Sequence, residues 1–252
     1  MTLNSFANRT VLITGAAGGF GSLLAEELAS AGARLCLSDY DSSGLEAVVD
    51  ALRSRGAQVF GVVSDVSKEL QVRQMVERCV TEFGRLDIAV NNAGLSAPMK
   101  ALVDTTEADL DRNFAVNAKG VFFGMKYQIV QMLAQGGGII LNVASKAGLG
   151  GAPKLAAYCA AKHAVVGLSR TAAIEYAAKG IRVNAICPYY SPTPLVTEGI
   201  DPATREMLAR GTPMKRLGEP GEIVQAMLAL IAPENSYLNG QALAVDGGAS
   251  AF

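Results

Sequence analysis

A short apolar run that leads into a glycine-rich turn constrains the fold of this chain more than any other feature. Val11, Leu12 and Ile13 have the composition of a buried strand, and residues 14–21 then read Thr-Gly-Ala-Ala-Gly-Gly-Phe-Gly. Apolar residues recur at helical spacing after the turn, which predicts a helix; they are Leu23, Leu24, Ala25, Leu28 and Ala29. The N–H groups at the start of such a helix favour a phosphate, and glycines let the backbone approach it closely.

The rest of the chain continues to alternate strand-like and amphipathic segments. The strand-like segments lie at about 10–14, 33–38, 57–63, 86–90, 138–143, 181–186 and 241–245. This alternation predicts an α/β fold, a doubly wound parallel sheet of about seven strands with helices on both faces. Half of the 252 residues are apolar. That is enough for one large core, so we expect a single domain over residues 1–252.

Ligands of such sheets bind beyond the carboxyl ends of the strands. Residues suited to ligand binding follow the predicted strands at those ends, namely Gly15, Asp39, Asp65, Asn92, Ser145 and Pro188. We therefore expect these residues to share one site.

Asp39 ends the second predicted strand, 18 residues after Gly21. An acid at this distance from a glycine turn can accept hydrogen bonds from both ribose hydroxyls of a dinucleotide. A 2′-phosphate on that ribose would be repelled by the carboxylate, and no Arg or Lys at positions 16–20 or 40–43 offsets the repulsion. The sequence therefore favours NAD over NADP, with an ordinary turn aspartate as the alternative for Asp39.

Tyr158 and Lys162 lie one helical turn apart, on the same face of a predicted helix. The pKa of a free tyrosine is about 10, so a phenol is a poor base at neutral pH. A cation about 4 Å away contributes on the order of 4 kcal/mol at an effective dielectric near 20, enough to lower that pKa by about two to three units. The pair predicts a general acid/base, although taken alone it could equally be two surface residues of a helix.

Further motifs follow in order along the chain. Asp65 and Val66 follow the third predicted strand, Asn91-Asn92-Ala93-Gly94 follows the fourth, Asn117 lies within a predicted helix, and Ser145 precedes Tyr158 by thirteen residues. Together with the glycine turn and Lys162, this set resembles the short-chain dehydrogenase/reductase family over essentially the full length of the chain. The resemblance implies a Rossmann-like fold, NAD as cofactor, a homotetramer, and interconversion of a secondary alcohol and a ketone.

The resemblance also implies which residues act. Tyr158 would be the general acid/base, Ser145 would orient the substrate oxygen, Lys162 would lower the tyrosine pKa and bind ribose, and Asn117 would hold a water in a proton relay. The implied cofactor-binding residues are Gly15, Gly19, Phe20 and Gly21 at the phosphates and ribose, Asp39 at the adenosine ribose, Asp65 and Val66 at the adenine, and Asn92, Tyr158, Lys162, Pro188 and Thr193 at the nicotinamide end.

These residue types suit alcohol oxidation without appeal to the family. The hydroxyl proton must be removed as hydride leaves carbon, so a base has to lie within hydrogen-bond reach of the oxygen, and Tyr158 could be that base. A neutral hydroxyl such as Ser145 can stabilise charge on the same oxygen. The hydride chemistry itself belongs to the cofactor.

The chain departs from the family pattern after Pro188. The family usually has a glycine next, and an isoleucine two residues before the threonine, whereas this chain has Tyr189 and Ser191. Pro192 fixes its own φ and restricts Ser191, so we expect the loop to follow a different path. Tyr189 and Tyr190 either pack on a cyclic or aromatic substrate or face solvent.

A lid over the substrate pocket is expected at about residues 189–217. Its apolar residues are Leu195, Val196, Ile200, Met207, Leu208 and Met214, and Leu95, Met99 and Leu149 lie near predicted strand ends. Such a wall favours a hydrophobic secondary alcohol or ketone, cyclic, aromatic or steroid-like, over a small charged substrate. Methionines also commonly fill cores, so this expectation concerns shape and polarity alone.

Other partners and sites are not expected. A net charge of −1 provides no field that would attract nucleic acid or a membrane surface. The chain shows neither an apolar run of about 18 residues nor a signal pattern, which predicts a cytoplasmic protein. The four cysteines are widely separated and His163 is the only histidine, so no metal site is expected. His163 directly follows Lys162 and projects about 100° away from it, which argues against a Ser–His–Asp hydrolase.

Two alternatives remain for the function. One is an NADPH-linked ketoreductase of the 3-oxoacyl carrier-protein reductase type, against which Asp39 argues. The other is a non-catalytic NAD-binding sensor, against which the intact Asn117, Ser145, Tyr158 and Lys162 argue.

Overall fold

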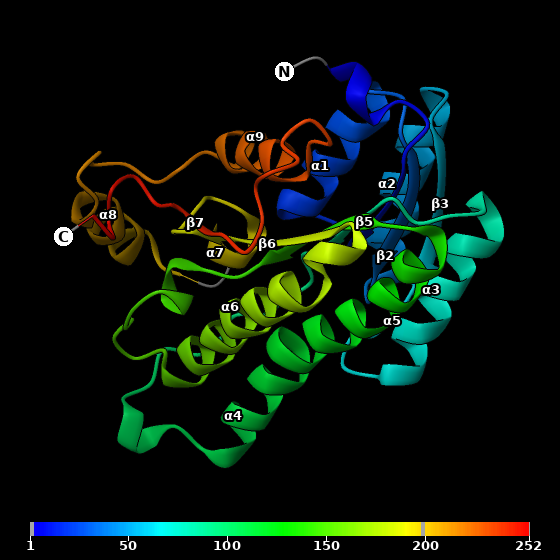
Figure 1. Cartoon of the computed structure of the whole chain (residues 1–252). Helices are drawn as coiled ribbons and strands as arrows, with labels where there is room; N and C mark the ends of the chain where they lie inside the picture. Colours follow the sequence, from blue (N-terminus) through cyan, green and yellow to red (C-terminus); the bar gives the residue numbers. More distant parts are fainter. Residues whose placement is uncertain (1–2, 198–199, 252) are drawn as a thin grey trace.

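The computed structural model describes residues 3–197 and 200–251, and its centre is a seven-stranded parallel sheet (Figure 1). The strands are β1 (Thr10–Thr14), β2 (Arg34–Asp39), β3 (Gln58–Val63), β4 (Ile88–Asn91), β5 (Gly138–Val143), β6 (Ile181–Pro188) and β7 (Ala242–Val245). Their order is β3-β2-β1-β4-β5-β6-β7. The chain therefore forms β1 to β3 toward one edge of the sheet, returns to the centre, and forms β4 to β7 toward the other edge. The predicted doubly wound parallel sheet is confirmed, with strand ends that differ by at most two residues.

Helices cover both faces of the sheet. One face carries α1 (Gly19–Ser30), α2 (Ser42–Ser54) and α9 (Pro220–Ile231), and the other carries α3 (Glu69–Phe83), α5 (Gly120–Gln135) and α6 (Ala156–Tyr176) (Figure 1). Side chains of β1 alternate between the two cores: Val11 and Ile13 pack with α1 and α9, and Leu12 packs with α3 and α5. Because both faces are covered, the central strands are mainly apolar on both faces rather than apolar on one face and polar on the other.

A helical stretch with an irregular middle precedes β5. It runs from α4 (Glu107–Asn113) through η3 (Phe114–Lys119), a π-helical segment, into α5. Asn117 lies within η3, so the helix predicted around it is present. The sequence did not predict that this part of the helix is π-helical. Such segments often occur at functional sites.

The remaining helical segments are short. They are η1 (Leu3–Phe6), η2 (Leu102–Asp104), η4 (Lys146–Gly148), η5 (Ala177–Lys179), α7 (Pro194–Thr197) and α8 (Pro202–Gly211). Within the described ranges, no helix combines the length and apolar character that crossing a membrane requires.

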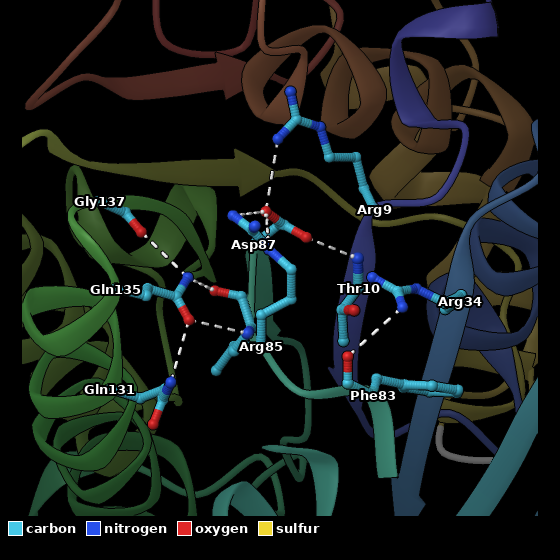
Figure 2. A network of polar contacts seen from close by, with 10 residues as sticks. Arg9, Thr10, Arg34, Phe83, Arg85, Asp87, Gln131, Gln135 and Gly137 are labelled. Atoms are coloured by element: carbon cyan, nitrogen blue, oxygen red, sulfur yellow. Dashed lines mark hydrogen bonds and ion pairs between the residues drawn. The ribbon is translucent and has the colours of Figure 1, made fainter. Parts of the chain in front are cut away.

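Asp87 joins β1 and β4 at the amino end of the sheet (Figure 2). Its carboxylate is buried and accepts a hydrogen bond from the backbone N–H of Thr10 at 2.9 Å. The guanidinium of Arg85 lies 2.7 Å from the same carboxylate, and that of Arg9 lies at 3.4 Å. The two strands between which the chain reverses direction are therefore fixed to each other by one carboxylate.

We expect Asp87→Ala to lower the free energy of unfolding by roughly 1–3 kcal/mol, because it leaves a buried N–H without a partner. Asp50→Ala is a matched control, since it removes a carboxylate whose partner, Arg53, is also exposed, and it should stay within about 0.5 kcal/mol. Urea denaturation of the three proteins would measure the difference. Equal stability of the two variants would contradict a structural contribution of Asp87.

Candidate active site

A cavity of about 960 Å³ lies at the carboxyl ends of the strands. The predicted site residues that line it are Gly15, Gly19, Phe20, Asp39, Asp65, Val66, Asn92, Asn117, Ser145, Tyr158, Lys162, Pro188, Tyr189, Tyr190 and Thr193. These residues come from the ends of β1 to β6 and from the helices that follow. The structure therefore brings together residues that lie far apart along the chain.

The glycine turn closes tightly against the end of β4. Gly15 has a φ of +66°, and a Cβ there would lie 2.8 Å from the Cα of Ala93. The side-chain amide of Asn92 donates to the carbonyls of Thr14 at 3.0 Å and Gly15 at 2.9 Å. Gly21 does not line the cavity; it is buried, and a Cβ there would collide with the carbonyl oxygen of Gly15. Only glycine at these two positions allows the turn to close.

Asp39 is held at the edge of this turn. Its carboxylate accepts hydrogen bonds from the backbone N–H groups of Ala17 at 2.9 Å and Asp41 at 3.0 Å. Beside it, the hydroxyls of Ser38 and Ser64 are buried, and neither has a hydrogen-bond partner within the described chain. Both serines line the cavity. Buried hydroxyls without partners are uncommon in folded proteins, and here they flank a fixed carboxylate, as a bound nucleoside would require.

The opposite end of the cavity shows the same feature. The Ser191 hydroxyl is buried without a partner among the described residues, and Ser191 lines the cavity. Thr193 reaches the glycine turn, since a Cβ on Gly19 would lie 3.6 Å from the Thr193 side chain. The two ends of the cavity thus present polar groups, with the glycine turn between them. This arrangement fits an elongated dinucleotide.

Ser145 and Tyr158 both lie in the cavity wall, and the Ser145 hydroxyl acts on the phenol. Ser145 follows β5, and its Oγ also accepts from the backbone N–H of Ala147 at 3.1 Å. Burial raises the pKa of Tyr158 to about 12, while the hydrogen bond with Ser145 acts to lower it. The phenol is therefore protonated at neutral pH in this structure.

Lys162 lies on α6 one turn after Tyr158. Its Nζ donates to the carbonyl of Val143 at 2.8 Å and lies 5.6 Å from the centroid of the Tyr158 ring. Lys162 is buried, and burial lowers its pKa to about 8. Burial therefore shifts the pKa of Tyr158 and that of Lys162 more than any other interaction in this structure. The lowering of the tyrosine pKa by Lys162 stays a prediction.

Asn117 lies between the loop after β4 and Lys162. Its Oδ1 accepts from the backbone N–H of Leu95 at 3.0 Å, and its Nδ2 donates to the Leu95 carbonyl at 3.0 Å and to Asn113 at 3.1 Å. Gly94 fits between Asn117 and Lys162, since a Cβ on Gly94 would lie 2.9 Å from Asn117 Oδ1 and 3.5 Å from Lys162 Nζ. The asparagine is fully buried and fixed. The water relay assigned to it stays a prediction.

The two tyrosines after Pro188 lie at the cavity wall. The Tyr189 and Tyr190 rings meet edge to face, with centroids 4.9 Å apart. Both are half-buried, and burial raises the pKa of each phenol. Tyr189 and Tyr190 were expected either in the substrate pocket or facing solvent, and the structure places both in the cavity wall.

The segment expected to form a lid contains α7 and α8. Its cavity-lining apolar residues are Val196, Ile200, Met207 and Leu208, and Leu95 and Met99 line the same cavity. Two expected wall residues lie elsewhere. Met214 is exposed beside Gly247, and Leu149 packs against the hydrophobic core. Residues 198–199 and the side chain of Leu195 lie outside the described part of the chain.

Several residues of the cavity wall were not predicted from the sequence. They include Ser38, Ser64, Arg112, Val116, Lys146 and Leu155. Lys146 directly follows Ser145, and Val116 directly precedes Asn117, so adjacency to a motif residue was the available signal. For Arg112, the signal was its spacing of one helical turn from Val116.

His163 and the cysteines lie outside the cavity wall. The exposed His163 contacts the carbonyl of Cys159, one turn earlier, through Nδ1 at 2.9 Å. All four cysteines are free, three of them buried and Cys159 partly so. Over the described ranges, no group of three or more His, Cys, Asp or Glu side chains could hold a metal ion.

The chain is similar to known proteins over nearly its whole length. A family model described as enoyl-(acyl carrier protein) reductase matches residues 15–250. Levodione reductase from Leifsonia aquatica is 39% identical, over 98% of this chain and 96% of the relative. A crystal structure of levodione reductase has a TM-score of 0.94 at 39% identity, covering 98% of this chain and 99% of that chain.

Two further proteins are similar over nearly their whole length. Cyclohexanol dehydrogenase from Acinetobacter sp. (strain SE19) is 36% identical, over 97% of this chain and 96% of the relative. The crystal structure of 3-ketoacyl-(acyl-carrier-protein) reductase from Brucella melitensis, complexed with NADH, has a TM-score of 0.90 at 35% identity. It covers 97% of this chain and 99% of that chain.

The buried ammonium of Lys162 should make stability depend on pH. Its pKa is about 8 in the folded protein, against an ordinary value of 10.5. Between these two values the unfolded chain binds more protons, so stability rises with pH. We expect the free energy of unfolding of the wild type, minus that of Lys162→Met, to increase by about 2–3 kcal/mol from pH 7 to pH 10.

Urea denaturation at each pH would measure this difference. Lys179→Met, which removes an exposed lysine near the end of the same helix, is the matched control and should follow the wild type at every pH. Parallel stability curves for the wild type and Lys162→Met would contradict the lowered pKa.

Proposed function

Because the chain belongs to the short-chain dehydrogenase/reductase family, we propose that it is an NAD-dependent oxidoreductase that interconverts a hydrophobic secondary alcohol and its ketone. One observation carries this proposal. A single cavity holds Ser145 beside Tyr158, the buried Lys162, and at its other end the fixed carboxylate of Asp39. Such an arrangement serves a dinucleotide and a substrate oxygen together.

The residues present suit a nicotinamide dinucleotide. The glycine turn would bind the phosphates through backbone N–H groups, Asp39 the adenosine ribose, and Asp65 with Val66 the adenine. Asn92, Lys162, Pro188 and Thr193 would border the nicotinamide end, as would Tyr158. When bound, the cofactor supplies the hydride acceptor or donor.

In the proposed mechanism, Tyr158 exchanges a proton with the substrate oxygen. In oxidation the phenolate removes the hydroxyl proton, and in reduction the phenol donates it. Ser145 donates a hydrogen bond to the same oxygen and stabilises charge there. Lys162 favours the phenolate by its positive charge. Asn117, fixed against the Leu95 backbone, would hold a water of the proton relay.

The wall of the cavity supports a cyclic substrate. Val196, Ile200 and Leu208 give it an apolar side, and the paired rings of Tyr189 and Tyr190 offer flat surfaces against which a ring could pack. Two similar proteins are named for cyclic substrates, levodione and cyclohexanol. In this proposal the whole chain is one dehydrogenase domain, with residues 189–217 as its lid.

We further propose a homotetramer in the cytoplasm, without nucleic-acid or membrane partners. The exposed surface of α5 carries the large apolar residues Phe122, Val130 and Leu133. Exposed apolar groups gathered on one helix are typical of an interface between protein chains. This surface supports association of identical copies.

A carrier-protein ketoreductase is the alternative activity. One similar structure is a 3-ketoacyl-(acyl-carrier-protein) reductase, so the comparison includes both classes. The fixed carboxylate of Asp39 argues against NADPH in this chain. A non-catalytic sensor would not need the Ser145–Tyr158 pair.

Tyr158→Phe removes the group that exchanges the proton. We expect it to lower kcat for NAD-dependent oxidation of cyclohexanol by about 10²–10⁴-fold while the Kd for NADH stays within threefold. NADH formation at 340 nm and calorimetric titration with NADH would measure the two quantities. Tyr237→Phe, which changes a fully exposed tyrosine, should leave both unchanged.

Other outcomes would point elsewhere. Turnover that survives in Tyr158→Phe would contradict the assignment of the acid/base. Tight NADH binding with no turnover of cyclic, aromatic or steroid alcohols would favour the sensor, and turnover of an acyl carrier-protein thioester with NADPH would favour the ketoreductase.

Asp39→Ser should weaken the preference for NAD. Removing the carboxylate removes its repulsion of a 2′-phosphate, so we expect the ratio of kcat/KM for NAD to kcat/KM for NADP to fall at least about tenfold, or about 1.4 kcal/mol. Asp41→Ser is the matched control. It removes an exposed carboxylate from the same turn and should leave the ratio within twofold. An unchanged ratio in Asp39→Ser would refute the argument.

A further inference from the structure

Charge is distributed unevenly along the cavity wall. Within the described part of the chain, the only acidic side chains that line it are Asp39 and Asp65, which follow β2 and β3. The cationic side chains that line it are Arg112, Lys146 and Lys162. The two signs of charge therefore come from different elements of the fold.

The sheet order separates the carboxylates from Lys146. This lysine follows β5, and β5 is three strands from β2 and four from β3. At about 4.8 Å per strand, these separations are roughly 14 Å and 19 Å. Both far exceed the distance of about 4 Å within which an ion pair forms. Neither Asp39 nor Asp65 therefore pairs with Lys146.

Lys146 and Arg112 also lack closer partners. Neither side chain forms an ion pair or hydrogen bond within the described residues, whereas the Lys162 ammonium donates a hydrogen bond to the Val143 carbonyl. On the same helix as Arg112, the carboxylate of Asp109 is occupied by Lys100 at 2.7 Å. Two cations thus border the cavity with no protein carboxylate to pair with.

The position of Lys146 connects it to the reacting oxygen. It is the next residue after Ser145, which lines the cavity together with Tyr158. A lysine side chain reaches roughly 6 Å from its Cα, as bond lengths near 1.5 Å require. Because Lys146 lines the same cavity as Ser145 and Tyr158, its ammonium is within reach of a substituent on a ring that is bound there.

Arg112 approaches the same region from α4. That helix packs against α6, which carries Tyr158. Arg112 lies one helical turn before Val116, which also lines the cavity. A planar guanidinium can bind a carboxylate through two hydrogen bonds. It therefore complements the single charge of Lys146.

We propose that Lys146 and Arg112 bind a carboxylate of the substrate, so that the preferred substrate is a cyclic alcohol or ketone that carries this group away from its reacting carbon. The inference rests on the proposed dehydrogenase activity and narrows its substrate class. It also refines the expectation from the sequence: the ring is hydrophobic, and its far substituent is anionic.

The test compares two substrates that differ in one group, 4-hydroxycyclohexanecarboxylate and 4-methylcyclohexanol, with NAD as the acceptor and each ring isomer assayed separately. We expect the wild type to prefer the carboxylate at least tenfold in kcat/KM at low salt. The preference should shrink as NaCl rises from 0.05 to 0.5 M, because salt screens the attraction.

Lys146→Met and Arg112→Met should each lower kcat/KM for the carboxylate about five- to twentyfold, mainly through KM, and lower it much less for 4-methylcyclohexanol. Lys179→Met, which removes an exposed lysine outside the cavity wall, is the control and should change neither value. No preference in the wild type, or equal losses on both substrates in the variants, would overturn the anion site while leaving the dehydrogenase in place.

Calorimetric titration with cyclohexanecarboxylate tests the site apart from turnover. Binding to the wild type that is lost in Lys146→Met would support the site even if no alcohol is oxidised. Absence of binding to the wild type would overturn the site. Absence of turnover with every alcohol and either cofactor would overturn the proposed function instead.

Discussion

The hydrogen bonds between the ends of β1 and β4 are the constraint on which the rest of the structure depends. The Thr14 hydroxyl accepts hydrogen bonds from the backbone N–H groups of Asn92 and Ala93, each at 3.1 Å. The side-chain amide of Asn92 in turn donates hydrogen bonds to the Thr14 and Gly15 carbonyls. The chain reverses its direction across the sheet between these two strands, so their loops separate and leave room for a ligand. Asp87 fixes the same strands at the opposite end. The cavity therefore opens at the carboxyl ends of β1 and β4, two strands that are joined to each other at both of their ends.

A second buried network aligns the strand that leads to Ser145 with the helix that carries Tyr158. Asn91 of β4 donates to Gln128 of α5 at 3.0 Å and to Asn142 of β5 at 2.8 Å, and Asn142 donates to Ser169 of α6 at 2.9 Å. All four side chains are buried. Leaving any of them unpaired would be costly, so the network favours one register between β5 and α6. That register brings the Ser145 hydroxyl to the phenol.

The sequence was sufficient for the features that repeat or occur as motifs. Alternating strands predicted the sheet, and motif residues at strand ends predicted one shared cavity, because parallel strands place their carboxyl ends together. The burial of single apolar residues was not predictable. Met214 and Leu149 are apolar like their neighbours, yet one is exposed and the other packs against the core. The unpartnered hydroxyls and the unpaired Lys146 were also out of reach, since a missing partner becomes visible only when the surrounding chain is in place.

The apolar wall that suits a cyclic substrate also works against the charged form of Tyr158. Burial raises the pKa of the phenol to about 12 and lowers that of Lys162 to about 8, so the same desolvation disfavours both the phenolate and the ammonium. In the proposed mechanism the phenolate and the ammonium would stabilise each other, and their attraction is stronger at a buried site than in water. The Val143 carbonyl, which accepts from Lys162 at 2.8 Å, keeps the cation beside the ring. In the proposed function, burial by the apolar wall would therefore bear on both the choice of substrate and the acid/base strength of Tyr158.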